Sequence, residues 1–427
     1  MVKPSDHWTS FQNLDRESKH AKQIEELLSN ADFGYLCSRA LAVRRKGHSS
    51  GVKESQHGEY TCSVDPTKFA YGTHNVALEI AFSDSVCWIA RVRLPYEGEE
   101  EAQVERDMLS EIATIRLVKE KTTVPVPQMF GNDVNGTNPL GYRYILMEAL
   151  PGRVLDTTFS KAVPEIHKEK VAEQLAEHFN QLSTLRFDKI GRMWCGTEID
   201  EQPHIISFNT RDGVDGEYTQ RTVGPFATSL EYFYTVRQGD NRAVLAKHAD
   251  EDDWATACWI LKQALPAMIT QNNIHGPFPL CHLDLHFNNI LLDDNYNITG
   301  IIDWSEAQTV PLERYAISPE FVTFPGLTAE ENEPIKAFCA LFVKALKNRE
   351  RIGPQDNISK QSPMLSDIVG TPMAELVYRC TYSYPWRALS DARLVLRLLY
   401  GKEATLETFK AFYRSATVSS QQTCIGA

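Results

Sequence analysis

Apolar residues recur at every second position along one stretch of the chain, and this pattern predicts β-strands. The stretch from Lys68 to Leu94, KFAYGTHNVALEIAFSDSVCWIARVRL, contains the alternating set Val76, Leu78, Ile80 and Phe82. A period of two is typical of a strand with one buried face. The segments YGTHN and SDS are rich in turn formers and divide the stretch into three strands. We therefore expect a small antiparallel sheet here.

The next segment, EEEAQVERDMLSEIATIRLVKEKTTVPVP, changes to a helical period. Its apolar positions that share one helix face are Val104, Met108, Ile115 and Val118. The PVP sequence that follows removes backbone donors and predicts the end of the helix. Beyond it, Tyr144 to Met147 indicates a last strand of this sheet, followed by a break at Pro151-Gly152.

The remaining chain is mainly helical in pattern. PEIHKEKVAEQLAEHFNQLSTL has an amphipathic face, and DEDDWATACWILKQALPAM repeats this with an acidic start that favours a helix N-terminus. Between them, residues 200–237 are rich in Gly, Pro and Asp, and we expect a long irregular insert. Such inserts are often functional, so this one is a candidate for acceptor binding, although a surface excursion explains it equally well.

One segment gathers polar residues around two short apolar runs: CHLDLHFNNILLDDNYNITGIIDW, from Cys281 to Trp304. Ile290 to Leu292 and Ile298 to Ile302 predict strands, and DDNYN between them predicts a hairpin turn. The hairpin brings Asn289 and Asp303 side by side, with Asp284 one loop away.

The alternative is a solvated hairpin whose Asp and Asn residues only make turns. This explanation suits four residues within the turn: Asp293, Asp294, Asn295 and Asn297. It suits Asp284 and Asp303 poorly, because both flank apolar strands.

Carboxylate and amide oxygens are hard ligands that suit magnesium, which is commonly shared with substrate phosphates. His282 and His286 do not indicate zinc, because the glutamate of a zinc-binding HExxH helix is missing. A loop acid, an asparagine and an aspartate after a hairpin form a set known from phosphoryl transfer.

These residues resemble the HxDxxxxN and IDW motifs of the aminoglycoside phosphotransferase and choline kinase-like family. The resemblance implies that Asp284 is the catalytic base and that His282 braces its loop. It implies that Asn289, within the catalytic loop, and Asp303 bind Mg²⁺, with ATP as the phosphate donor. His286 fits the frequent HxDxHxxN form of the motif.

The same resemblance gives the earlier strands a role in nucleotide binding. The turn from Gly72 to Asn75 takes the place of a phosphate-covering loop, although it is poor in glycine and an ordinary hairpin turn explains it equally well. Adenine recognition is expected from the backbone of the hinge, Glu148 to Leu150.

The third strand offers two cations on one face, Arg91 and Arg93, since side chains alternate along a strand. We prefer Arg91, because Ile89 two positions earlier then supplies an apolar contact for the base. Arginine replaces the usual lysine of the fold and looks like what fungal-type members carry. Two solvated arginines are the alternative.

Glu111 falls within the apolar stripe of the predicted helix and needs a partner if it is buried. The resemblance implies an ion pair between Arg91 and Glu111, which positions the arginine. Glu105, near the other edge of the stripe, is the rival partner.

The expected fold class is α+β: a protein-kinase-like bilobal fold with a small antiparallel sheet plus helix and a larger, mainly helical lobe that carries the hairpin. The expected boundaries are a helical extension and linker over 1–66, the N-lobe over 67–150 and the C-lobe over 151–427.

Composition narrows the function classes. The chain has 44 basic and 56 acidic residues and a net charge of −12, which argues against general nucleic-acid binding. No run approaches the roughly 18 apolar residues of a membrane span, and no secretory signal is evident. Nine cysteines without a CxxC pair favour a reduced compartment, so we expect a cytoplasmic protein. The terminal CIGA has a poor prenylation pattern, and we expect a frayed tail.

The expected function is an ATP- and Mg²⁺-dependent kinase that phosphorylates a hydroxyl of a small molecule. The resemblance admits aminoglycosides, amino alcohols such as choline, sugars and natural products as acceptors. A catalytically inactive kinase-fold scaffold is the first alternative, motivated by the substituted lysine and the glycine-poor loop. A protein kinase or a nucleotidyl transferase on the same fold is another, and product mass distinguishes them.

Overall fold

A computed structural model describes residues 3–48, 60–96, 98–197, 201–214, 217–248, 250–317, 328–352, 364–381 and 385–423. The chain divides into two packing units, and each is described here by itself. The first unit comprises Met1–Asp156, Trp194–Pro203 and Phe287–Ser305. The second comprises Thr157–Met193, His204–His286 and Glu306–Ala427.

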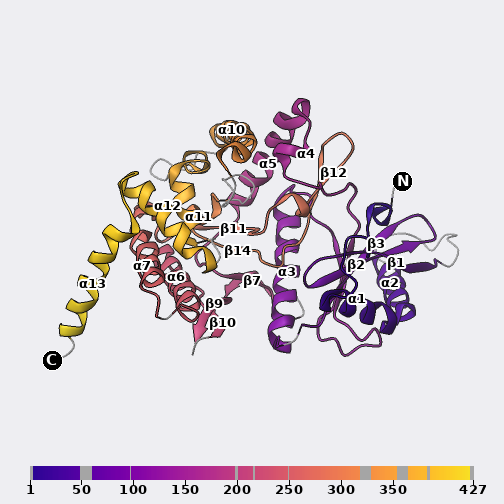
Figure 1. Ribbon diagram of the computed structural model, residues 1–427. Coiled ribbons are helices and arrows are strands. Elements are labelled where there is room, and N and C mark those ends of the chain that lie inside the picture. Colours follow the sequence, from indigo (N-terminus) through magenta and orange to yellow (C-terminus); the bar gives the residue numbers. More distant parts are fainter. Residues whose placement is uncertain are drawn as a thin grey trace. The chain divides into compact units, whose positions relative to one another are not determined.

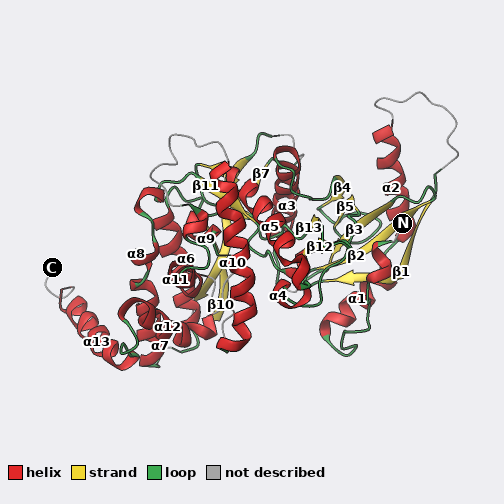
Figure 2. Cartoon of the chain, turned by 90° about the horizontal axis from the view of Figure 1, so that it is seen from above, coloured by secondary structure: helices red, strands yellow, loops and turns green. Residues whose placement is uncertain are grey.

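The first unit is built on a five-stranded antiparallel sheet of order β1-β2-β3-β5-β4 (Figures 1 and 2). Its strands are β1 (Cys62–Tyr71), β2 (Asn75–Phe82), β3 (Cys87–Arg93), β4 (Met129–Asp133) and β5 (Tyr144–Glu148). The alternating residues of β2 are all buried, as their period of two predicts. Their face of the sheet is called the outer face below.

Two N-terminal helices, α1 (Lys19–Asn30) and α2 (Phe33–His48), cover the outer face (Figure 1). Leu27 and Leu36 from these helices pack in one core with Phe69, Leu78 and Trp88 of the sheet. The hydroxyl of Ser18 accepts from the backbone N–H of Ala21 and caps α1. The first sixty residues are therefore part of the core of this unit as far as they are described.

Helix α3 (Glu101–Lys121) follows β3 and occupies the range that its apolar period predicts. Val104, Met108, Ile115 and Val118 are all buried along it. The Glu111 side chain is only 4% exposed, so a carboxylate lies in the buried stripe of the helix.

The hairpin of β12 (Ile290–Leu292) and β13 (Ile298–Ile301) forms as expected. Its turn is held by the Asp293 carboxylate, which accepts from the backbone N–H groups of Asn295 and Asn297. These residues therefore have the turn role assigned to them from the sequence.

The hairpin packs with the first unit, whereas the sequence grouped it with residues 151–427. Arg153 and Leu292 exchange two backbone hydrogen bonds of 2.9 Å, and the N–H of Ile301 donates to the carbonyl of Pro125 at 2.7 Å. These hydrogen bonds join residues far apart in the sequence, so a local sequence pattern does not predict them.

The second unit is mainly helical (Figure 2). Its helices are α4 (Phe159–Ala162), α5 (Glu165–Thr184), α6 (Ser229–Leu245), α7 (Asp252–Gln263), α8 (Leu265–Met268), α9 (Leu312–Tyr315), α10 (Ala329–Ile352), α11 (Pro372–Thr381), α12 (Ala388–Tyr400) and α13 (Leu406–Thr423). Short strands accompany them: β6 (Arg186–Phe187), β7 (Arg192–Trp194), β11 (Phe278–Cys281) and β14 (Gln308–Thr309). Phe179 of α5 packs against Tyr315 and Phe342, so α5 lies at the centre of the core.

The expectation of an irregular insert at residues 200–237 is wrong. This segment forms β8 (His204–Ile206), then β9 (Phe208–Val214) and β10 (Glu217–Val223), which pair in continuous register, and then the start of α6. Polar strand residues gave no clear alternation, because this hairpin packs on α6 through charge pairs as well as apolar contacts.

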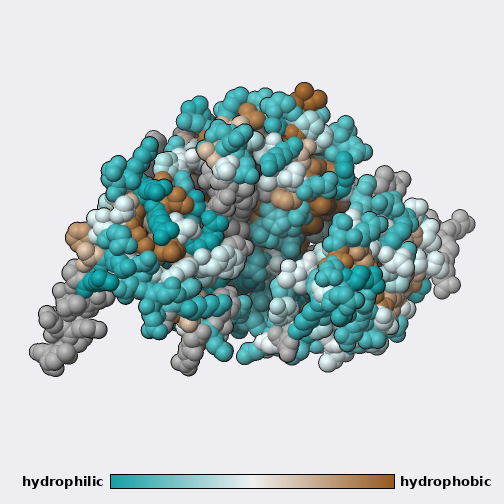
Figure 3. Space-filling model, in the orientation of Figure 1, coloured by the Kyte–Doolittle hydropathy of each residue, from teal (hydrophilic) through white to brown (hydrophobic). Residues whose placement is uncertain are grey.

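The expected α+β fold class is confirmed: the first unit has an antiparallel sheet with helix α3, and the second is mainly helical. In the described ranges, no helix combines the length and apolar character needed to cross a membrane. The visible face of the surface is mostly hydrophilic (Figure 3). Each of the eight cysteines in these ranges has a free thiol. The terminal CIGA lies outside the described residues.

Candidate active site

The residues singled out in the sequence fall into two groups, one in each unit. Arg91, Glu111, Asn289 and Asp303 belong to the first unit. His282 and Asp284 belong to the second, and five positions of chain separate Asp284 from Asn289.

The centre of the first group is the guanidinium of Arg91 on β3. One of its terminal nitrogens donates to Glu111 Oε1 on α3, and the other donates to Asp303 Oδ1 at 2.9 Å. The Arg91 side chain is 13% exposed. A planar guanidinium can bridge two carboxylates in this way, whereas a lysine ammonium is a single point of charge.

The surroundings of Arg91 keep it charged. Burial of the guanidinium lowers its pKa, but the carboxylates of Glu111 and Asp303 outweigh this effect and raise the pKa of Arg91 above its ordinary value. One cation between two carboxylates leaves a net negative charge. A further cation, such as a metal ion, is therefore electrostatically favoured beside this group.

The contacts decide between the two arginines of β3. Arg93 pairs with Glu99 at 2.6 Å, so Arg91 is the cation that reaches α3. They also decide between the two glutamates of α3, since Glu111 and not Glu105 is the partner of Arg91.

Asn75, the first residue of β2, lies against the same guanidinium. With its amide turned so that the oxygen faces Arg91, Oδ1 accepts from Nη2 at 2.8 Å and from Nε at 3.2 Å. Gly72 closes the preceding turn, where its N–H donates to the carbonyl of Asn75 at 2.9 Å. An added Cβ at Gly72 would meet no atom within 4 Å, so the space beside this turn is open.

Three further residues had been expected to contact the nucleotide. Ile89 lies half-buried on β3, directly opposite Met147 of β5. Glu148 ends β5, and its carboxylate accepts from the backbone N–H of Gln128 and pairs with Lys119 at 3.3 Å. Leu150 lies near Gly300 of the hairpin. The structure places these residues, and their binding roles remain predictions.

Asp303 follows β13 in a backbone conformation that is uncommon for aspartate. Its φ of 61° lies in the left-handed region, where a residue other than glycine is strained. The next residue anchors this geometry, since Trp304 is fully buried and its indole N–H donates to the carbonyl of Ile301 at 3.0 Å. The hydroxyl of Ser305 donates to Asp303 Oδ1 at 2.9 Å. The strain is thus imposed by the surrounding structure and directs a carboxylate that is 41% exposed.

Asn289 and Asp303 fit a magnesium site by their chemistry. Asn289 is buried directly before β12, and its carbonyl accepts from the N–H of Ile302. Both side chains offer hard oxygen atoms. Among the described residues, no three His, Cys, Asp or Glu side chains cluster as a metal site.

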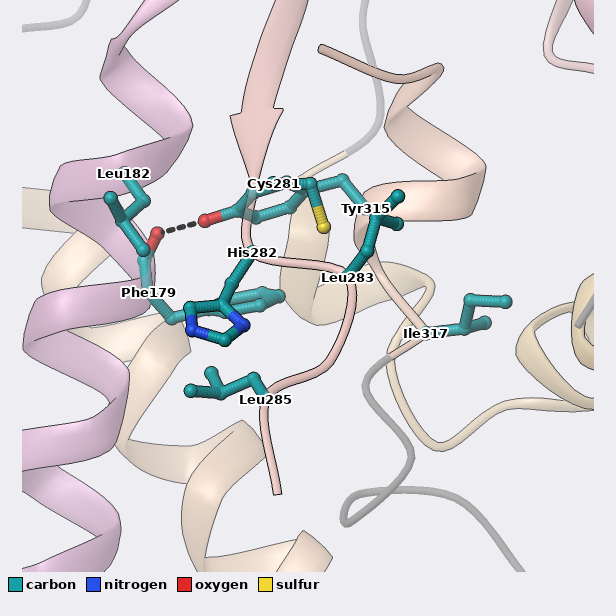
Figure 4. Close-up of a pocket in the computed structure, with 8 residues that line it drawn as sticks. All are labelled: Phe179, Leu182, Cys281, His282, Leu283, Leu285, Tyr315 and Ile317. Atoms are coloured by element: carbon teal, nitrogen blue, oxygen red, sulfur yellow. Dashed lines mark hydrogen bonds between the residues drawn. The ribbon is translucent and has the colours of Figure 1, made fainter. Parts of the chain in front are cut away.

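The second group surrounds the loop after β11. His282 is 2% exposed and lines a small apolar pocket with Phe179, Leu285 and Tyr315 (Figure 4). The Tyr315 hydroxyl donates to the carbonyl of Phe179 at 2.6 Å, as the dashed line in Figure 4 shows. A buried imidazole in a packed apolar pocket fixes the backbone of this loop.

Asp284 follows this anchor and is 42% exposed. His286 Nε2 lies 3.4 Å from Asp284 Oδ2. Leu283, between His282 and Asp284, has φ of 62°, so this loop contains a second strained residue. The brace role of His282 and the base role of Asp284 remain predictions.

Sequence reasoning missed two features of the first group. It assigned separate roles to Arg91 and Asp303 and did not predict their ion pair, which no local pattern could reveal. It also overlooked Glu79 on β2, which is 7% exposed. A charged residue between the apolar residues Leu78 and Ile80 was the available signal.

Comparisons with known proteins agree with these motifs. A family model described as the phosphotransferase enzyme family, APH, matches residues 80–312. Clavilactone A biosynthesis cluster protein Y of Ampulloclitocybe clavipes is 23% identical over 270 residues, 62% of this chain and 65% of that protein. Altered inheritance of mitochondria protein 9, mitochondrial, of Eremothecium gossypii is 24% identical over 367 residues, 74% of this chain and 59% of that protein.

The chain thus spans less than two thirds of the length of each of these relatives. Among solved structures, the apo form of a thermostable mutant of aminoglycoside phosphotransferase APH(4)-Ia has a TM-score of 0.44 and 14% identity. That match covers 85% of this chain and 99% of the other.

Proposed function

The chain belongs to the phosphotransferase enzyme family, since the family model matches more than half of it, and on this premise we propose that it transfers the γ-phosphate of ATP to a hydroxyl group of a small molecule. The family match supports the coarser activity, that of a kinase-like phosphotransferase. The donor, the metal and the acceptor class are the proposal.

In this proposal the hydroxyl oxygen of the acceptor forms a bond to the γ-phosphorus of ATP, and the bond between that phosphorus and the ADP oxygen breaks. Asp284 accepts the proton that the hydroxyl loses. His282 holds the loop that carries Asp284. Asn289 and Asp303 provide oxygen ligands for Mg²⁺, which when bound neutralises phosphate charge.

In the first unit, Arg91 contributes positive charge toward the phosphates, and Glu111 holds its guanidinium in place. Catalysis then depends mainly on positioning and on charge stabilisation.

One observation carries the proposal, and it concerns the carboxylate of Asp303. The residue has a strained backbone conformation, its side chain is half-exposed, and it forms an ion pair with Arg91, which also pairs with Glu111. A carboxylate that only stabilised the hairpin would not require strain and exposure together. The geometry suits a residue whose oxygen atoms serve a ligand.

The test is phosphate transfer by the purified full chain with ATP and MgCl₂ against a panel of hydroxyl-bearing small molecules. We expect a product heavier by one phosphate group, and we expect Asp284→Asn to abolish its formation while ATP still raises the melting temperature. Asp294→Ala, an exposed acid at the turn of the same hairpin, is the matched control and should transfer phosphate normally. Normal transfer by Asp284→Asn would refute the role of this residue.

A second candidate is a nucleotide-binding scaffold without transfer. The observation that favours it is the engagement of Arg91 by Glu111, Asp303 and Asn75, which differs from a lysine reaching toward phosphates. An Mg²⁺-dependent ATP shift in melting temperature without transfer to any acceptor would support this candidate.

We also propose a cytoplasmic location. The Eremothecium gossypii relative carries the word mitochondrial in its name, so the proposal needs its own test. Fluorescence of the tagged chain that coincided with a mitochondrial marker would contradict it.

A further inference from the structure

The N-terminal segment crosses the edge of the sheet in the first unit. The hydroxyl of Ser10 donates to the carbonyl of Thr67 on the edge strand β1 at 2.9 Å. Immediately after this point, Phe11 packs edge-on against Phe69 on the outer face, with 4.8 Å between ring centroids. Residues before Ser10 therefore approach the sheet from its other side.

A short 3₁₀ turn, η1 (Pro4–His7), lies on that other side and is anchored by a buried carboxylate. The backbone N–H of Ser5 donates to Glu79 Oε2 at 3.0 Å. The ammonium of Lys3 lies 3.8 Å from Glu79 Oε1. Ser5 is 6% exposed and Glu79 is 7% exposed, so this contact excludes solvent.

The strand register identifies this side of the sheet. Glu79 of β2 lies opposite Ile89 of β3, and Ile89 lies opposite Met147 of β5. Directly opposed residues of antiparallel strands share a face. Arg91, two positions after Ile89, has its side chain on this same face and reaches Asp303 from it.

Glu79, Ile89 and Met147 thus form a row across three strands, and Glu79 is its charged member. Ile89 is the residue expected beneath the base. A buried carboxylate needs a partner, and the N-terminal turn supplies both a hydrogen bond and a positive charge. The turn covers Glu79, and beyond Glu79 the row continues with the apolar residues Ile89 and Met147. Apolar residues beside such a cover are suited to a flat, mostly apolar ring.

We propose that the turn Pro4–His7, held on Glu79, forms one wall of the site that receives the adenine base. This inference rests on the proposed ATP-dependent function. The turn Pro4–His7 lies outside residues 80–312, the part of the chain that the family model matches.

The experiment measures the dissociation constants of ATP and of tripolyphosphate, both with MgCl₂, by calorimetry on the full chain. Lys3→Glu places a negative charge beside Glu79 and should loosen the turn without changing any residue of the sheet. Its side chain is 51% exposed, so the fold should persist. We expect ATP to bind about threefold more weakly and tripolyphosphate to bind with less than about twofold change, because only ATP carries the base.

Lys22→Glu is the matched control, since it makes the same charge change at an exposed position of α1. It should alter neither constant. A chain that begins at Thr9 removes the turn altogether and should weaken ATP binding by about tenfold, again with tripolyphosphate spared. Its circular dichroism spectrum and melting curve show whether the sheet is intact.

Equal ATP affinity in wild type, Lys3→Glu and the shortened chain would overturn the inference and leave the turn a structural cap. Tighter ATP binding by the shortened chain would also overturn it, because the turn would then obstruct the site. In both cases ATP still binds, so the proposed function stands. Absence of ATP binding by the wild type would refute the proposed function and this inference with it.

Discussion

Each unit contains a cluster of arginine and carboxylate side chains, and the two clusters differ in which group is shared. In the first unit, one arginine, Arg91, is shared by two carboxylates, Glu111 and Asp303. In the second unit, one carboxylate, Asp212 of β9, is shared by two arginines. It accepts from Arg242 of α6 at 2.6 and 2.8 Å and pairs with Arg221 of β10 at 2.9 Å.

The clusters differ in how completely the acid is enclosed. The Asp212 side chain is 3% exposed, its oxygen atoms also accept from the N–H of Gly213, and it fastens the β9–β10 hairpin to α6. The Asp303 side chain is 41% exposed and sits on a strained backbone. An enclosed acid with only protein partners serves the fold, whereas a strained acid open to solvent is available to a ligand.

The largest expected effect is a loss of phosphate transfer when the acid of the first cluster, but not that of the second, is replaced. Under the proposed function, Asp303→Asn should reduce phosphate transfer by about 10³-fold, because it removes a carboxylate proposed to bind the metal that neutralises phosphate charge. Its melting temperature should change little, since the side chain is partly exposed. Steady-state kinetics with the acceptor found in the screen measures this effect.

Asp212→Asn is the matched control and should keep the activity per folded molecule. If both variants lost transfer equally, the division into a ligand-binding and a structural cluster would fail.

The next effect concerns the arginine of the first cluster. Arg91→Ala should destabilise the first unit by about 3–5 kcal/mol, because it leaves the Glu111 carboxylate buried without its cation. Arg91→Lys keeps one positive charge and should cost less, about 1–2 kcal/mol, since an ammonium replaces a two-pronged contact. Urea denaturation followed by circular dichroism compares the two variants. Equal losses would show that the two-pronged guanidinium contact, and not the positive charge alone, provides the stabilisation.

A smaller loss is expected in the second cluster. Asp212→Asn should destabilise by about 2 kcal/mol, because two arginines lose their carboxylate but can turn toward solvent. Thermal melting near neutral pH measures this loss. A change within experimental error would mean that the hairpin is held by its apolar contacts.

At acidic pH, the difference in stability between the wild type and Asp212→Asn should disappear. The hydrogen bonds from Arg242 hold the pKa of Asp212 below its ordinary value. The stabilisation is therefore complete above the ordinary aspartate pKa of about 3.9 and is lost as the pH falls through the lower pKa of the folded state. Melting curves of wild type and Asp212→Asn should converge on acidification, and a constant gap would contradict this assignment.

The smallest expected change in stability comes from replacing a glycine, and it should differ between Gly213 and Gly72. A Cβ at Gly213 would lie 2.4 Å from the carbonyl oxygen of Arg242, whereas at Gly72 it would meet nothing within 4 Å. Gly213→Ala should cost about 1–2 kcal/mol, because the hairpin must move away from α6. Gly72→Ala should leave stability unchanged. If Gly72→Ala also binds ATP as the wild type does, this turn does not approach the phosphates closely.

Much of the first unit could be predicted from the sequence. The period of two in β2 and the helical period of α3 each identify an element, because residues of one face must be buried together. The hairpin turn around Asp293 was equally predictable, since its side chain bonds backbone groups only a few positions away.

The second unit was harder where its elements depend on distant partners. The β9–β10 hairpin carries arginine, aspartate and threonine along its strands and therefore has no clear apolar alternation. Its stability comes from Asp212 and from the close approach of Gly213 to α6, a helix that begins more than ten residues later.

The sequence by itself predicted the residues proposed for phosphate transfer, because Asp284, Asn289 and Asp303 stand around short apolar strands at spacings that resemble those of the family. It also determined that a buried glutamate of α3 needs a cation. Only the tertiary structure decided that Arg91 meets both Glu111 and Asp303, and that the N-terminal turn lies on Glu79. These contacts join residues 20, 212 and 74 positions apart, and a distance in space between such residues is set by packing and not by local sequence.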